Sequence, residues 1–202
     1  MNEADAAAYA QIYSAPGKRT DLDTFMYISS DVGIGASIML EGTLFGGKHS
    51  WAGEIGHTCV DPAGPKCTCG ANGCLEQYAG QVALLANAGL AQNAGMSELI
   101  SVFDAGDARA RATLDTAATS LGRAIANALN LLDVDVVILG GNLALLLPRI
   151  EQLLFSEVQY RQLRSRWAPT QILADVHSQN SALLGACYAT VIRFIHAPTD
   201  WM

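Results

Sequence analysis

The sequence predicts an α/β fold, in which strands and helices alternate in the second half of the chain. Runs of apolar residues predict short strands at residues 24–29, 37–40, 134–139 and 170–176, of which the first is expected to be buried. Long helical patterns lie between and after the last two of these strands, as in layered α/β folds. Half of the 202 residues are hydrophobic and only 15% are charged, so the chain can bury a core and disorder is excluded.

The first half predicts one helix followed by a β-meander. Residues 2–13 are rich in alanine, and this helix begins with nothing before it to cover its apolar face. We take this as a sign that the chain is the second part of a longer protein. Residues 14–23 are expected to form a loop, and tight turns are expected at Gly33-Ile34-Gly35 and at Glu41-Gly42.

The second half predicts mostly helix. Helices are expected over residues 75–91, from 97 onward, and over 107–132, 143–164 and 181–195. The first is expected to be interrupted near Gly80 and Gly89, Ser97 is the expected N-cap of the second, and Pro148 is expected to distort the fourth. Cys187 in the last helix is expected to lie in the core.

Charge and hydropathy exclude two classes of partner. The 12 basic and 19 acidic residues give a net charge of −7, which repels phosphate backbones, so the chain is not expected to bind DNA or RNA by itself. The most apolar stretch, residues 134–147, is too short and too interrupted to span a bilayer. The start of the chain lacks a signal-peptide pattern, so we expect a cytoplasmic location and no membrane contact.

A cluster of cysteines is the most specific feature. His57, Cys67, Cys69 and Cys74 form the pattern H-x9-C-x-C-G-x-x-G-C. Five cysteines in a cytoplasmic chain favour metal binding over disulfides, and three thiolates with one imidazole predict a closed tetrahedral zinc site with a structural role. The alternative is a set of buried cysteines. Cys59 is either a spare ligand or a small apolar residue.

Two carboxylates flank this cluster. Glu54 lies three residues before His57, and Glu76 lies two residues after Cys74. Carboxylates accept the paired hydrogen bonds that vicinal sugar hydroxyls donate, and a zinc-bound imidazole can present its second N–H outward. Glu54, His57 and Glu76 could therefore surround one polyol, although solvated surface carboxylates are an equal interpretation of the spacing.

The run GIGASIMLEGTLFGGKHSWAGEIGHTCVDPAGPKCTCGANGCLEQYAG resembles the ROK family of sugar kinases and sugar-responsive transcriptional repressors. NLLDVDVVILGGNLA and ALLGACYAT extend the resemblance over nearly the whole chain. It implies the C-terminal lobe of an actin-like ATPase (ribonuclease H-like) fold with a zinc knuckle. Residues 1–202 would form this single lobe, with a zinc and sugar loop at 49–80, a helical segment at 75–132 and an α/β segment at 133–197. The N-terminal lobe and any DNA-binding head would be absent.

The resemblance also assigns residues. It places Asn2, Glu54, His57 and Glu76 at sugar-contacting positions and makes His57, Cys67, Cys69 and Cys74 the zinc ligands. No catalytic residue is firmly assigned, because Glu3 stands where family kinases have their catalytic Asp.

A second departure lies in the phosphate loop, which reads Asp31-Val32-Gly33-Ile34-Gly35 instead of Gly-Thr-Gly-x-Gly. Val32 lacks the hydroxyl donor of the threonine. Asp31 places a negative charge where phosphates would approach, so both changes oppose ATP binding.

These features favour the effector-binding and dimerising portion of a ROK transcriptional regulator. It would be non-enzymatic, bind a small sugar, form a homodimer, hold structural zinc and contact DNA only through a missing N-terminal head. The alternative is a fragment of an ATP-dependent sugar kinase similar to glucokinase, fructokinase or an N-acetylhexosamine kinase. A third hypothesis is a zinc-holding remnant that only dimerises.

Overall fold

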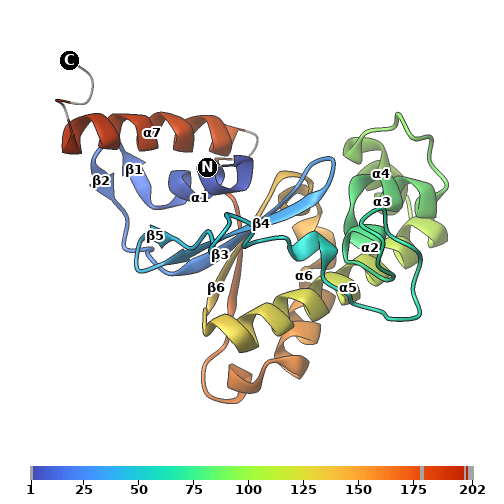
Figure 1. The fold of residues 1–202 in the computed structure, drawn as a ribbon. Coiled ribbons are helices and arrows are strands. Elements are labelled where there is room, and N and C mark those ends of the chain that lie inside the picture. Colours follow the sequence, from blue (N-terminus) through green and yellow to red (C-terminus); the bar gives the residue numbers. More distant parts are fainter. Residues whose placement is uncertain (1, 178–179, 198, 200–202) are drawn as a thin grey trace.

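The computed structural model describes residues 2–177, 180–197 and 199, and it has the predicted α/β architecture (Figure 1). Its centre is a five-stranded sheet in the order β5-β4-β3-β6-β7. β3 pairs antiparallel with β4 and parallel with β6, so the sheet joins a meander to a parallel α/β unit. The strands are β3 (Phe25–Ser30), β4 (Ile34–Leu40), β5 (Thr43–Leu44), β6 (Val136–Gly140) and β7 (Gln171–Ala174).

Helices cover both faces of the sheet (Figure 1). Phe25 and Tyr27 of β3 pack on one face of the sheet, against the first and last helices of the chain. Met26 and Ile28 face the opposite side and belong to the larger core, which includes the two longest helices. Both faces of β3 are thus buried, which explains why its sequence is apolar without alternation. The helices are α1 (Glu3–Gln11) and α7 (Ser181–His196) on the first face, and α5 (Ala108–Leu132) and α6 (Gly141–Arg161) on the second.

Three short helices form a separate group beside α5 (Figure 1). The predicted interruptions of the first helical segment are confirmed, since Gly80 precedes α3 and Gly89 ends it in the left-handed conformation. The three helices are α2 (Glu76–Ala79), α3 (Gln81–Ala88) and α4 (Met96–Asp104). Within the described residues, no helix is long and apolar enough to cross a membrane.

The structure corrects two predictions in the first half. The expected loop at 14–23 contains a small hairpin of β1 (Tyr13–Ala15) and β2 (Lys18–Arg19). The turn expected at Gly33-Ile34-Gly35 lies earlier, because Ile34 is buried and pairs with Ser30 at the start of β4. The turn consists of residues 31–33, closed by a hydrogen bond from the Asp31 N–H to the Gly33 carbonyl.

In the second half of the chain, two helices begin earlier in the structure than the sequence predicts. α4 begins one residue before Ser97, with Gly95 as the N-cap, because burial of Met96 brings that residue into the helix. α6 begins at Gly141 and ends at Arg161, with Pro148 inside it. Two 3₁₀ helices, η1 (Ile55–His57) and η2 (Leu163–Arg166), complete the elements used below.

The prediction that Cys187 lies in the core is wrong. α7 buries Ser181 and Gly185 against α1, and Cys187, two residues further along the helix, lies on the opposite, exposed side. The sequence also predicts that Trp167 and Trp201 lie at the edge of the core or in an interface. Trp167 is 75% exposed, so it does not belong to the edge of the core. Trp201 lies outside the described residues.

α1 and α7 pack so closely that only glycine fits at position 185. A Cβ there would overlap with the Ala6 carbonyl oxygen of α1 and would approach the Ala10 nitrogen to 3.0 Å. Both of these atoms belong to the backbone, so relief requires the helices to separate.

We therefore expect Gly185→Ala to destabilise the chain by about 2 kcal/mol, the usual cost of overpacking, despite the helix propensity of alanine. Urea denaturation would measure this change. Gly35→Ala is the matched control, because a Cβ there meets no atom within 4 Å. Equal stability of the two variants would contradict the close packing of α1 on α7.

Candidate functional site

A crevice lies at the carboxyl ends of the parallel strands, where α/β sheets usually bind ligands. Ser29 and Asp31 are at the end of β3, Gly141 follows β6, and Asp175 follows β7. Two adjoining cavities open along this edge and share Glu3, Ser29 and Asp31 in their walls. Ser29 lies in the last two residues of β3 and Asp175 directly follows β7, so a polar residue at the carboxyl end of a strand was the only local sign of either.

The first cavity has a volume of about 290 Å³ and brings together residues that are distant in sequence. Its wall includes Asn2 and Glu3 from the start of α1 and Glu54 from the loop before η1. The predicted phosphate loop contributes Asp31, Val32, Gly33 and Gly35. Two of the four expected sugar-contacting residues, Asn2 and Glu54, therefore share one cavity with the residue at the catalytic position.

Asn2 has a second role that the sequence analysis missed. Its side-chain oxygen accepts the Asp5 N–H at 2.8 Å, and the Asp5 carboxylate accepts the Asn2 N–H at 3.1 Å, which forms a capping box. Asp5 also accepts a hydrogen bond from the Ser37 hydroxyl of β4, at 2.9 Å. The start of α1 is thus fixed to the sheet, while the amide nitrogen of Asn2 stays available for a ligand.

The second cavity is smaller, about 170 Å³, and lies between α1 and the α6 start. Tyr27, Gly141 and Ser181 line it together with the three shared residues. Glu3 therefore stands between two cavities, with the predicted sugar contacts on one side. A carboxylate in that place could exchange a proton with a ligand hydroxyl in the first cavity.

Glu76 lies on the other side of the phosphate loop. Its carboxylate accepts the Ile34 N–H at 3.3 Å, and it lines a third cavity of about 780 Å³ instead of the first. Val32 and Gly33 line both cavities and separate Glu54 from Glu76. A Cβ on Gly33 would lie 2.7 Å from the Glu76 carboxylate, so a larger residue there would displace this side chain.

A buried carboxylate network, absent from the sequence analysis, supports the second cavity. Asp175 accepts hydrogen bonds from the Tyr27 hydroxyl at 2.7 Å, from the Gln11 amide at 3.0 Å and from the Ser181 hydroxyl. Burial and the neighbouring Asp175 raise the pKa of Tyr27 well above its usual range, so this hydroxyl remains a donor. The network joins β3, α1 and α7 around one side chain.

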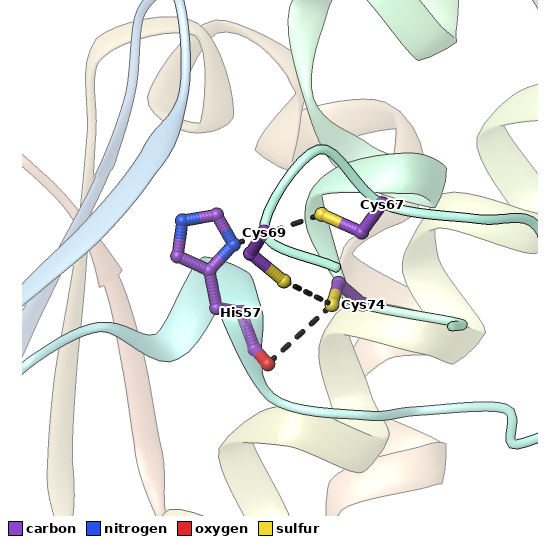
Figure 2. Close-up of side chains that lie close together, drawn as sticks. All are labelled: His57, Cys67, Cys69 and Cys74. Atoms are coloured by element: carbon purple, nitrogen blue, oxygen red, sulfur yellow. Dashed lines mark hydrogen bonds between the residues drawn. The ribbon is translucent and has the colours of Figure 1, made fainter. Parts of the chain in front are cut away.

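The four predicted metal ligands converge (Figure 2). The ligand atoms of His57, Cys67, Cys69 and Cys74 all lie within 4.8 Å of one another. The Cys69 and Cys74 sulfurs are 3.6 Å apart, and the Cys67 sulfur is 3.8 Å from His57 Nδ1. Zn–S bonds of about 2.3 Å require tetrahedral edges of roughly 3.5–3.8 Å, so this donor set fits zinc. We call these four residues the metal cluster.

One glycine makes the loop of the metal cluster possible. Gly73 has φ +66°, and a Cβ on it would overlap with the Asp61 carbonyl oxygen. Gly70 also has positive φ but lies in open space, so its role is conformational only. The close approach of residue 73 to residue 61 brings Cys74 beside His57, whose carbonyl lies 3.5 Å from the Cys74 sulfur.

The thiols of the metal cluster differ in acidity. A hydrogen bond from the backbone of Cys69 lowers the pKa of Cys67 to about 6, whereas burial raises the pKa of Cys74 to about 12. At neutral pH a metal ion would therefore find a thiolate at Cys67 and would have to displace a proton from Cys74.

His57 presents one ring nitrogen, Nδ1, to the sulfur of Cys67, and its other ring nitrogen points away from the sulfurs (Figure 2). That arrangement agrees with the predicted outward N–H, although His57 is not part of the wall of the first cavity. Gln77 adds a bond from its amide to the Cys67 sulfur at 3.7 Å, which ties α2 to the metal cluster.

We expect the purified chain to carry one zinc ion, and its removal by a chelator to lower Tm by roughly 10 °C, since about 3 kcal/mol or more of local folding free energy depends on the metal. Calorimetry with elemental analysis would measure both quantities. Cys67→Ser should lose the metal, and Cys187→Ser, on the exposed side of α7, should keep it. An unchanged Tm after complete metal removal would contradict the prediction.

Comparisons of the sequence and of the structure with known proteins point to the same family. The sequence profile of the ROK family matches residues 1–191. An N-acetylmannosamine kinase of Yersinia pestis is 33% identical over 187 residues, which cover 92% of this chain and 62% of that protein. The chain thus spans less than two thirds of the length of the curated relatives it matches.

Solved structures agree in fold. A ROK hexokinase from Thermus thermophilus superimposes with a TM-score of 0.79 at 30% identity, over 93% of this chain and 63% of that one. A ROK family glucokinase from Streptomyces griseus, in complex with glucose and AMPPNP, gives 0.73 at 25% identity, over 92% and 65%. A ROK family transcriptional regulator, a homologue of the E. coli MLC protein, shares the fold at 0.78 and 24% identity, over 95% and 52%.

The α/β fold, the metal cluster motif and the match over residues 1–191 lead to one conclusion: the chain belongs to the ROK family.

Proposed function

We propose that this chain is the sugar-binding and metal-holding lobe of an ATP-dependent ROK sugar kinase acting on a hexose or an N-acetylated hexosamine. The observation that carries the proposal is the position of Glu3 between the two cavities at the strand ends. The similarity to sugar kinases supports this hypothesis better than it supports the regulator that the sequence motifs favoured.

In this proposal the sugar occupies the first cavity. Asn2 donates a hydrogen bond from its amide nitrogen, and the exposed Glu54 carboxylate accepts bonds from hydroxyl groups. Glu3 takes the proton of the reacting hydroxyl, whose oxygen attacks the γ-phosphorus of ATP as ADP departs. His57 and Glu76, which lie outside this wall, would reach the sugar only if the loop from 54 to 76 moves toward the cavity.

Zinc would be structural in this lobe. All four positions of a tetrahedral site are filled by His57, Cys67, Cys69 and Cys74, so no position is left for a substrate. Its role would be to hold the loop that connects Glu54 to Glu76.

The second candidate is the sugar-responsive transcriptional regulator, as a homodimer that contacts DNA through a separate head. Asp31 and the 82% exposed Val32 favour it, because they replace phosphate-binding groups of the kinase loop with a negative charge and an apolar side chain. Both candidates use the same sugar cavity and differ in whether phosphate is transferred.

Sugar binding is tested by calorimetry with N-acetylmannosamine, N-acetylglucosamine and glucose. We expect Glu54→Gln to weaken binding roughly tenfold to hundredfold, because hydrogen bonds to a charged acceptor are lost. Glu98→Gln, an exposed carboxylate on α4, is the matched control and should bind as the parent does. Equal affinities of the two variants would remove Glu54 from the site.

Phosphate transfer is tested by ADP release in the natural-length protein. Glu3→Gln should lower the rate by about 10²–10⁴-fold because the base is lost. Glu3→Asp should raise the rate, by up to about a hundredfold, if the longer side chain misplaces the carboxylate. Sugar binding without ADP release from any of the three proteins would favour the regulator.

A further inference from the structure

Cys59 lies in the loop between His57 and Cys74, but it is not one of the four residues of the metal cluster. Its side chain is exposed, and it lies outside the group of four whose ligand atoms converge. A bound metal therefore leaves its thiol open to reagents in solution, unlike the sulfurs that would coordinate the metal.

The backbone pairs Cys59 with Cys74. The two residues form an antiparallel bridge. Hydrogen bonds flank the pair, from the Val60 N–H to the Gly73 carbonyl at 2.8 Å and from the Leu75 N–H to the Thr58 carbonyl at 2.9 Å. Cys59 and Cys74 are thus a non-hydrogen-bonded pair, in which the side chains lie on one face and the Cα atoms are about 4.5 Å apart. Disulfides join Cα atoms at roughly 4.4–6.8 Å, so this register is compatible with a disulfide.

We propose that Cys59 and Cys74 are an oxidisable pair, and that their disulfide withdraws one ligand from the metal cluster. The proposal concerns this chain in either candidate function and does not depend on which sugar binds.

The oxidant that we propose is a peroxide. The Cys59 thiol reduces hydrogen peroxide, which gives a sulfenic acid at Cys59 and one water molecule. The Cys74 sulfur then attacks the Cys59 sulfur, the S–O bond breaks, and the departing hydroxide takes a proton to form a second water molecule. Two thiols are oxidised and one peroxide is reduced, and a thiol reductant reverses the step.

The disulfide would affect the third cavity through the residues that follow Cys74. Cys74 could no longer serve as a ligand, and His57, Cys67 and Cys69 would retain three of four positions. Glu76, two residues on, is held on Ile34 at the phosphate loop, so release of the metal would loosen the contact between this loop and α2.

The test uses the zinc-loaded, reduced chain treated with hydrogen peroxide. A metallochromic indicator measures zinc release, and peptide mass spectrometry without reduction identifies the disulfide. We expect a Cys59–Cys74 linkage formed in step with zinc release, and both reversed by dithiothreitol with added zinc. In Cys59→Ser, zinc release should be about tenfold slower, because the accessible thiol that forms the sulfenic acid is absent.

Cys187→Ser is the matched control, since it removes the other exposed cysteine outside the metal cluster and should release zinc as fast as the parent. The peptide map detects a Cys59–Cys74 disulfide whether or not the chain holds zinc. An error in the metal assignment can therefore be told apart from an error in this inference. Linkages confined to Cys67, Cys69 and Cys74, or unchanged zinc release in Cys59→Ser, would overturn it.

Discussion

Closure of the loop from His57 to Cys74 by four converging ligands is the constraint on which the rest of the site depends. Between residues 58 and 75 the structure describes turns and single bridges, with no helix and no strand longer than one pair. The backbone hydrogen bonds of this segment are those of turns and isolated bridges, without the repeating ladder of a helix or a sheet to offset its conformational entropy. A metal ion bound by these four residues would supply that free energy, and the folding of the loop would then be coupled to the occupancy of the metal cluster.

The constraint reaches the cavities through contacts at both ends of the loop. Before the loop, Gly53 lies against β4, where the Ala36 N–H donates to the Gly53 carbonyl at 2.7 Å. After it, Glu76 accepts the Ile34 N–H. The same strand thus receives both ends, and the first and third cavities form on the two sides of the loop at Val32 and Gly33. The metal cluster can therefore influence the shape of both cavities although its four residues line neither of them.

Local patterns predicted much of this from the sequence. The convergence of His57 with three cysteines followed from their spacing, and α5 followed from apolar residues at three- and four-residue steps, because each pattern is a property of one short segment. The predictions that are wrong concern positions whose structure depends on contacts between segments distant in sequence. Ser97 has the side chain of an N-cap, but burial of Met96 starts α4 earlier, and Cys187 is exposed because α7 presents Gly185 to α1. The Asp175 network joins residues up to 164 positions apart, and no local pattern reports such a contact.

The two halves of the site have departed from the family pattern to different degrees. Asn2 and Glu54, the proposed sugar contacts, have the residue types that the family resemblance implies, and they share a cavity. The phosphate side carries Asp31 and Val32, together with Glu3 one methylene longer than the expected Asp. A negative charge beside a phosphate costs more in a low-dielectric crevice than in water, so these changes would oppose nucleotide binding and leave the proposed sugar contacts in place. Because a sensor needs only the sugar contacts and a kinase also needs the phosphate contacts, Glu3, Asp31 and Val32 are the residues that would separate the two proposed functions.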